Sequence, residues 1–233
     1  MRHGPALSAS PSLLARCLPA SAAALLGLVV ASTAVAATAP LARPVPTLQL
    51  SGPVHWTAVS GRTGQFSKTV GGNGDIRAAK HIKWWESSDE PCQFQVGLAA
   101  VDGNEPPRNV DDEFCGGSPG SPKVVWRPAA GEFVTAVAVC LTDKADTSKD
   151  KLKGLRLWGR IVDASTGELG AENGPAENTR SHCAQWSPKV SCPAGEIATK
   201  IKVYYNRQSG SATTNEHGFA RGISLGCRAV ELD

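Results

Sequence analysis

The sequence predicts an all-β fold, and the prediction rests on three observations. Apolar residues alternate with a period of two in its best-defined segments, and no stretch beyond residue 36 keeps a helical period. One strand–loop–strand unit also occurs three times. Its clearest copy is Gly131–Val162, which opens with GEFVTAVAVC and closes with KGLRLWGRIV. The other copies lie at 195–230, which opens with GEIATKIKVYY, and at 74–101.

The opening strands of the second and third copies have the pattern of half-buried strands. Their predicted inward rows are Phe133, Thr135, Val137, Val139 and Leu141, and Ile197, Thr199, Ile201, Val203 and Tyr205. The first copy aligns with the second at a constant offset of 57, which matches Gly74 with Gly131 and Gly97 with Gly154. That offset puts Lys80 in the inward row, so either its side chain reaches out from a strand end or this register is wrong.

A single strand–loop–strand unit cannot bury one face by itself. Three such units can, if each forms one sheet of a three-sided barrel whose inner rows meet on the axis. We therefore predict a disulfide-stabilised β-prism of three Greek-key sheets over residues 54–233. Short strands at 54–60 and 65–70 precede the repeats, and Trp56 is the expected core anchor of the first of these.

Residues 1–36 have the order of a secretory signal peptide. Arg2 and Arg16 precede a short apolar run that ends in Ala34-Val35-Ala36. The alternative is an N-terminal membrane anchor, but the run is short for a bilayer span. Proline-rich residues 37–53 are expected to be a linker, and the mature chain is expected to have no transmembrane segment.

The charge balance argues against nucleic acid as a partner. Of 24 Lys and Arg, removal of Arg2 and Arg16 leaves 22 against 21 Asp and Glu, and no basic cluster stands out. The mature chain keeps six cysteines, an even number that indicates three disulfides in an oxidising, extracellular or periplasmic setting. The two that we expect to pair are Cys192 and Cys227, because the second repeat lacks both. Cys92, Cys115, Cys140 and Cys183 allow three pairings, of which we favour Cys92–Cys115 and Cys140–Cys183.

The third repeat resembles that of the vitelline membrane outer layer proteins. The matching residues are Cys192-Pro193-Ala194-Gly195-Glu196 before the first strand and Gly222-Ile223-Ser224-Leu225 with Cys227 in the second. The resemblance implies a secreted β-prism with disulfides and an affinity for oligosaccharides. More distantly, the architecture is similar to that of the jacalin-related lectins. Neither resemblance transfers a catalytic residue to this chain.

The third hairpin loop is the predicted ligand site. Tyr204, Asn206 and Arg207 enter it, and Asn215 and Glu216 lie within it. An outward tyrosine can stack on a sugar ring, and planar amides can form paired hydrogen bonds with its hydroxyls. The alternative is a solvated loop with no ligand.

Trp85, Glu86 and Asp89 in the first hairpin loop form a second candidate. Carboxylates beside an aromatic ring could hold a sugar or act as acid and base on a glycosidic bond, or they could simply be a solvated hairpin tip. Asp143, Asp146 and Asp150 could hold Ca²⁺, but interleaved lysines favour a mixed-charge surface loop. We expect no metal, no cofactor and no catalytic residue.

These observations predict a secreted, non-enzymatic, lectin-like module that binds carbohydrate, such as a cell-wall polysaccharide, through the loop tips of the prism. The second hypothesis is a structural or envelope-associated domain that binds a protein partner. A third is a glycan-processing enzyme or an inhibitor of one.

Overall fold

The computed structural model describes residues 47–72, 76–87, 90–103, 108–112, 121–125, 129–142, 146–207 and 218–233. The chain divides into two units, Met1–Arg43 and Pro44–Asp233, and every described residue belongs to the second. The predicted signal peptide therefore lies outside the described residues and stays a prediction.

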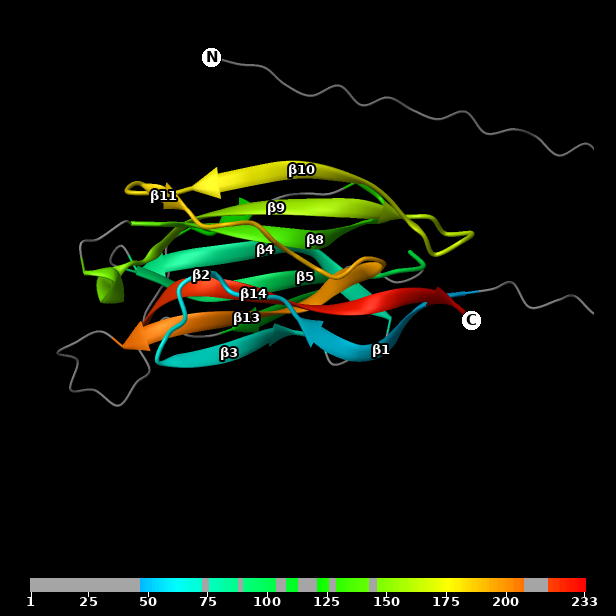
Figure 1. Cartoon of the computed structure of the whole chain (residues 1–233), viewed down its shortest axis with the longest axis horizontal. Coiled ribbons are helices and arrows are strands. Elements are labelled where there is room, and N and C mark those ends of the chain that lie inside the picture. Colours follow the sequence, from blue (N-terminus) through cyan, green and yellow to red (C-terminus); the bar gives the residue numbers. More distant parts are fainter. Residues whose placement is uncertain are drawn as a thin grey trace, which may run out of the picture. The chain divides into compact units, whose positions relative to one another are not determined.

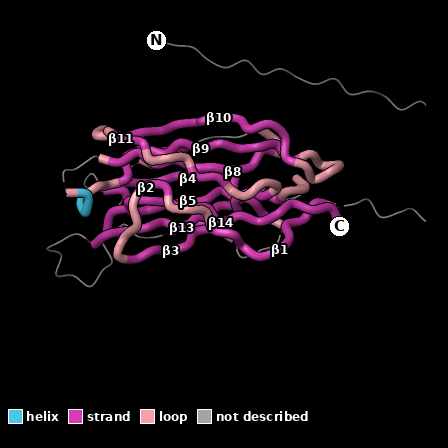
Figure 2. Tube along the Cα trace, in the orientation of Figure 1, coloured by secondary structure: helices cyan, strands magenta, loops and turns pink. Residues whose placement is uncertain are grey.

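The second unit consists of three antiparallel sheets (Figures 1 and 2). The first has the order β6–β5–β4–β7, formed by Arg108–Asp112, Glu90–Ala100, Arg77–Ser87 and Lys123–Val125. The second has the order β10–β9–β8–β11, formed by Leu169–Thr179, Leu152–Val162, Glu132–Leu141 and Gln185–Trp186, with β12 (Val190–Ser191) also on β8. The third has the order β1–β14–β13–β3, formed by Leu48–Trp56, Gly218–Leu232, Glu196–Arg207 and Phe66–Gly71, with β2 (Ser60–Gly61) also on β14. A 3₁₀ turn, η1 (Thr147–Lys149), lies in the second hairpin.

Each predicted repeat contains the central hairpin of one sheet: β4–β5, β8–β9 or β13–β14. In the first two sheets the flanking strands follow their own hairpin in the Greek-key order. In the third sheet the flanking strands β1 and β3 come from the N-terminal side of all three repeats. The two ends of the described chain are thus joined in one sheet, which closes the structure (Figure 1).

The inner faces of the three sheets meet in one hydrophobic core. Ile82 of the first sheet, Val137 of the second and Ile201 of the third belong to one cluster, and each side chain is fully buried. Tyr205 closes the same cluster, stacked on Phe66 at 5.4 Å between ring centroids. Three Greek-key sheets around one shared core form the predicted β-prism.

Two β-bulges recur at equivalent places in all three central hairpins. The first bulge falls between Ala79 and His81, Val134 and Ala136, and Ala198 and Lys200. The second falls between Trp85 and Glu86, Cys140 and Leu141, and Tyr204 and Tyr205. A bulge places an extra residue on one strand and reverses the alternation beyond it. Phe133 and Ile197 therefore leave the predicted inward rows and pack in a second cluster with Leu48 and Val162.

The bulges also correct the predicted alignment of the first two repeats. Ile82 takes the place of Val137, which is an offset of 55, and Val96 takes the place of Leu157, which is an offset of 61. The constant offset of 57 was wrong because the two hairpins have loops of different length. Gly97 is consequently equivalent to Trp158 and not to Gly154.

The corrected alignment also resolves the position of Lys80. It is the extra residue of the first bulge, where the second and third repeats have Thr135 and Thr199. Its ammonium donates to the Ala129 carbonyl at 2.7 Å and lies 5.3 Å from the centroid of the Phe133 ring. Burial lowers the pKa of Lys80, and the nearby Glu132 carboxylate opposes that shift.

The N-terminal strand begins earlier than predicted. Residues 48–53, placed in the linker from their proline content, form the start of β1, because Leu48 and Leu50 alternate inward and are buried. Trp56 is not the core anchor that we expected. It is paired with Gly226 on the outer face, is 38% exposed, and has the Lys202 ammonium 4.2 Å from its ring centroid.

Each of the two described disulfides links a strand to a connecting segment of the prism. Cys192–Cys227 and Cys140–Cys183 are both formed, with Cα–Cα distances of 5.7 and 5.5 Å. Cys92 is also disulfide-bonded, and its predicted partner Cys115 lies outside the described residues.

Ile82→Ala tests the shared core. We expect a loss of about 2–5 kcal/mol in the free energy of unfolding, since the cavity opens where three sheets meet. The matched control is Ile161→Ala, whose side chain is 44% exposed and should cost under about 1 kcal/mol. Urea unfolding of both variants measures the difference, and equal losses would contradict a common core.

Candidate functional site

The domain has two chemically different ends. At one end lie η1 and the loop-side ends of the three central hairpins β4–β5, β8–β9 and β13–β14, where the sequence predicted a ligand site (Figure 1). At the other end lie the β9–β10 turn and the segment between β12 and β13. Of the predicted site residues, Asp89, Asn215 and Glu216 lie outside the described residues, as does the side chain of Arg207.

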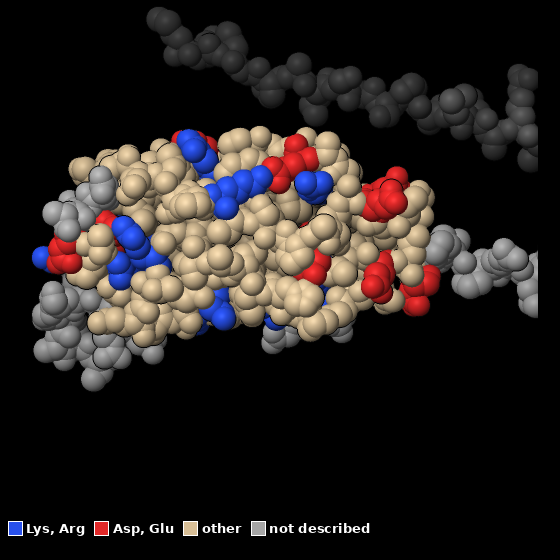
Figure 3. Space-filling model, in the orientation of Figure 1, with Lys and Arg blue, Asp and Glu red and all other residues tan. Residues whose placement is uncertain are grey.

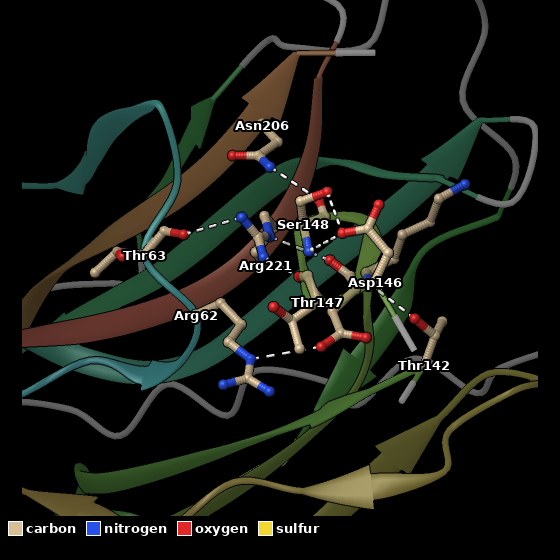
Figure 4. Close-up of polar contacts among 10 residues, drawn as sticks. Arg62, Thr63, Thr142, Asp146, Thr147, Ser148, Asn206 and Arg221 are labelled. Carbon is tan, nitrogen blue, oxygen red and sulfur yellow. Dashed lines mark hydrogen bonds and ion pairs between the residues drawn. The ribbon is translucent and has the colours of Figure 1, made fainter. Parts of the chain in front are cut away.

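The described residues of the third loop already have protein partners. The Asn206 side-chain amide donates to the Ser148 carbonyl at 3.0 Å (Figure 4). Its oxygen accepts from the Gln65 backbone amide at 3.1 Å. The half-buried Tyr204 accepts a hydrogen bond from the Ser224 hydroxyl at 3.2 Å. Asn206 thus joins the third hairpin to the second.

Arg221 organises the rest of this end. Its guanidinium donates to the backbone carbonyls of Thr63, Thr147 and Asp150, and burial lowers its pKa (Figure 4). Arg62 pairs with the Asp150 carboxylate at 3.4 Å. These contacts hold η1 and the segment between β2 and β3 against β14.

The aspartates weighed as a calcium site serve the same turn. Asp146 caps η1 by accepting from the hydroxyl and backbone amide of Ser148, and these hydrogen bonds lower its pKa. Asp143 lies outside the described residues. Among the side chains that the structure does describe, no group of three or more His, Cys, Asp or Glu is placed to hold a metal ion.

Glu86 is part of a largely buried charge cluster and not of a free loop tip. It occupies the inward position held by Leu141 and Tyr205 in the other repeats. Its carboxylate contacts the fully buried Lys153 ammonium at 3.1 Å and the Arg180 guanidinium at 3.2 Å. Trp85 beside it is half-buried. The described polar groups of the loop end therefore hold the loops together.

The opposite end contains a groove of about 740 Å³ between the second and third sheets. Eight of its fifteen lining residues have polar side chains. The lining consists of Thr135, Arg160, Thr166, Gly167, Glu168, Leu169, Glu172, Lys189, Ser191, Cys192, Pro193, Ala194, Gly195, Glu196 and Val230. Arg160 and Glu172 come from the β9–β10 hairpin, while Glu196 begins β13, so the groove exists only in the folded prism.

Two buried oxygens in this lining have no hydrogen-bond partner among the described residues. Glu196 is 8% exposed, and its Oε1 accepts from His55 Nδ1 at 2.6 Å, whereas its Oε2 accepts nothing. Thr135 is 4% exposed, and its Oγ1 also lacks a partner. A buried polar atom without a partner costs roughly 1–3 kcal/mol, so a ligand that supplies one gains that energy.

The equivalent threonine of the third repeat differs in this respect. Thr199 Oγ1 donates to the Gly226 carbonyl at 3.1 Å, although both threonines are the extra residue of the same bulge. The repeat position therefore does not require an unpaired hydroxyl. Only the threonine that lines the groove has one.

The charged side chains of the groove are partly paired among themselves. Lys189 pairs with Glu172, and its ammonium lies 4.8 Å from the centroid of the half-buried Trp158 ring. The Arg160 guanidinium donates to the Gly170 carbonyl at 3.1 Å. Glu168 is exposed at the rim.

Acidic residues gather at this end of the domain. Asp163 and Glu168 flank the β9–β10 turn, whose Gly167 packs against Val230 and Glu231 near the C-terminal Asp233. Figure 3 shows the acidic side chains together beside the C-terminus. The hydroxyl and backbone amide of Ser165 hold the pKa of Asp163 below its usual range. Within the described part of the chain, none of these four carboxylates has an ion-pair partner.

The sequence analysis did not predict the groove, although it singled out one motif that contributes to the lining. The motif Cys192-Pro193-Ala194-Gly195-Glu196 supported the resemblance described above, but none of its five residues was considered for ligand binding. The other half of the lining comes from β8, β9 and β10, which no local pattern places beside β13.

Comparison with known proteins finds similar folds and no sequence relatives. No protein-family model and no curated protein matches the sequence, so the vitelline membrane outer layer resemblance has no support from them. Among solved structures, Calystegia sepium agglutinin is 12% identical over 80% of this chain and 98% of its own, with a TM-score of 0.40. A mannose-specific jacalin-related lectin from Morus nigra, in complex with mannose, is 12% identical over 76% and 96%, with a TM-score of 0.43. Frutapin, a lectin from Artocarpus incisa, is 11% identical over 77% and 99%, with a TM-score of 0.44.

These values do not extend the likeness to a ligand or a binding site. The described residues also contain no helix that is long and apolar enough to cross a membrane.

Glu86→Gln tests the charge cluster at the loop end. We expect a loss of about 3–5 kcal/mol in the free energy of unfolding, because the Glu86 carboxylate no longer offsets the charge of the buried Lys153 ammonium. The double variant Glu86→Gln/Lys153→Met should recover most of that loss, since neither charge is then buried. A double-mutant cycle by urea unfolding checks this, and additive effects would show that the pair is not coupled.

Proposed function

We propose that this domain is a secreted, non-enzymatic carbohydrate-binding module and that the groove between the second and third sheets is its binding site. The observation that carries the proposal is the polar groove itself, with the two buried, unpartnered oxygens of Thr135 and Glu196 in its lining.

The chemistry of the lining favours a polyhydroxylated ligand. Pockets for apolar molecules are lined mainly by hydrophobic and aromatic side chains with a few polar groups, whereas polar side chains are the majority here. A sugar hydroxyl can both donate and accept. It can therefore donate to Glu196 Oε2 and accept from Thr135 Oγ1, Lys189 or Arg160.

The proposal rests on the groove and not on the similar lectin structures, whose TM-scores lie below 0.5. The disulfides support secretion, because such bonds persist mainly in oxidising compartments. Membership of the vitelline membrane outer layer family stays part of the proposal, supported by the short motifs of the third repeat.

The predicted loop site is the alternative location for the same function. Its described members, Tyr204, Asn206, Trp85 and Glu86, lie at the opposite end of the prism from the groove. Because the two ends share no residue, single substitutions can tell them apart.

A glycan array with cell-wall polysaccharides, probed with residues 37–233, tests the function. We expect selective binding that the free glycan competes away. Tyr204→Ala should retain it, because Tyr204 is remote from the groove. Loss of binding in Tyr204→Ala, with the fold kept by circular dichroism, would move the site to the loop end. Absence of any binding by the folded domain would overturn the proposal and favour a structural role.

Thr135→Val tests the groove directly. The change removes a buried hydroxyl that has no partner, so we expect equal or greater stability together with about tenfold weaker glycan binding. Thr199→Val is the matched control: it should lose about 1 kcal/mol of stability with its hydrogen bond to Gly226 and keep its affinity. Thermal unfolding and titration calorimetry measure both. Unchanged affinity in Thr135→Val would remove this hydroxyl from the site.

A further inference from the structure

We infer that Glu196 Oε2 accepts a hydrogen bond from a primary ammonium group of the ligand. The ligand of the groove is then an amino sugar with a free amine. The inference rests on the proposed function, because it specifies the class of carbohydrate that the same groove binds. Its basis is a comparison of Glu196 with the equivalent residue of another repeat.

Glu132 and Glu196 occupy the same position in the second and third repeats. Each begins its opening strand after a turn with a left-handed glycine, Gly131 or Gly195. Each donates its backbone amide to the carbonyl three residues earlier, at 3.2 Å to Ala129 and 3.1 Å to Pro193. Both side chains are buried, with exposures of 4% and 8%. The backbone surroundings of the two carboxylates are therefore alike.

Their hydrogen bonds differ in one respect. Both oxygens of Glu132 have donors, since Oε2 accepts from the Ala129 backbone amide at 2.9 Å and Oε1 from the Asn173 side chain at 2.9 Å. Glu196 Oε1 has His55, but its Oε2 has none.

Proline accounts for the missing donor. The residue equivalent to Ala129 is Pro193, which has no backbone N–H and cannot close the bond that Glu132 makes. In the second repeat the glutamate accepts a hydrogen bond from the backbone of its own turn. In the third repeat the equivalent oxygen, Glu196 Oε2, has no such donor and lies in the lining of the groove. The terminal torsion of a glutamate is broad, so a small rotation can turn that oxygen toward a ligand.

The charge at this end favours a cationic donor over a neutral hydroxyl. The lining contains two cationic side chains, Arg160 and Lys189, and three carboxylates, Glu168, Glu172 and Glu196, so its formal charge is −1. Lys189 pairs with Glu172. Asp163 and Glu231 lie at or beside the β9–β10 turn and add to the negative field there. A hydroxyl that donates to a carboxylate already forms a charge-assisted hydrogen bond, and an ammonium donor adds to it the attraction between two opposite charges.

The test compares three β-1,4-linked tetrasaccharides by titration calorimetry near neutral pH at one ionic strength: glucosamine, N-acetylglucosamine and glucose. The wild-type domain should bind the glucosamine oligomer at least about tenfold more tightly than the other two. Glu196→Gln should abolish that preference. Glu177→Gln, the same charge change on an exposed part of the second sheet, should keep it.

Pro193→Ala is the decisive variant, because it changes no charge and no polar side chain. The new backbone amide should donate to Glu196 Oε2 as Ala129 donates to Glu132, and the amine preference should fall about tenfold. A preference that survives in Pro193→Ala and Glu196→Gln would come from the acidic surface alone and would overturn the inference. Equal binding of all three oligomers would also overturn it and leave the proposed function intact. No binding of any glycan by the folded domain would overturn both.

Discussion

Every part of this structure depends on the burial of three sheet faces around one axis. A single hairpin exposes too much apolar surface to be stable in water, so each repeat needs the other two. The fully buried side chains of Ile82, Val137 and Ile201 show how closely the three faces meet. The same constraint explains why β1 and β3 join the last hairpin: without them the third sheet would have open edges beside the core.

The recurring bulges make this packing possible. A strand with strict alternation would keep one face toward the axis along its whole length. The first bulge lets Val134 and Val137 both face the shared core while Phe133 packs in the second cluster. Each bulge also adds one residue that the sheet does not need for pairing. Polar residues occupy several of those positions, including Lys80, Thr135, Thr199, Lys153 and Arg221, and each contributes polar chemistry at a fixed point of a rigid scaffold.

The sequence predicted the parts of the fold that local patterns encode. The three hairpins, the inward side of most core residues and both described disulfides follow from period-two alternation and from comparison of the repeats. The register of the first repeat was predicted wrongly, because a single offset between two glycines assumes hairpin loops of equal length. Lys80 in the predicted inward row was the one sign of this error in the sequence. Trp56 was misplaced for a related reason: nothing in VHWTAVS tells which face of an edge strand is covered. The groove could not be predicted from the sequence, because its lining combines residues of β8, β9 and β10 with residues at the start of β13.

Comparison of repeats within one chain also distinguishes polar groups whose hydrogen bonds hold the fold together from polar groups that have no partner within it. Equivalent positions share a backbone, so a hydrogen bond present in one repeat and absent in another is not a requirement of the fold. Glu132 and Thr199 keep their bonds, whereas Glu196 and Thr135 lack one each, and both of the latter line the same groove. Two missing hydrogen bonds in one groove lower the stability of the fold, although the equivalent positions of other repeats show that the fold allows both bonds. A ligand that completes both sets of bonds is the simplest physical reason for their coincidence. It makes the groove a more specific candidate than the loop end, where Asn206, Glu86 and Arg221 already contact protein groups.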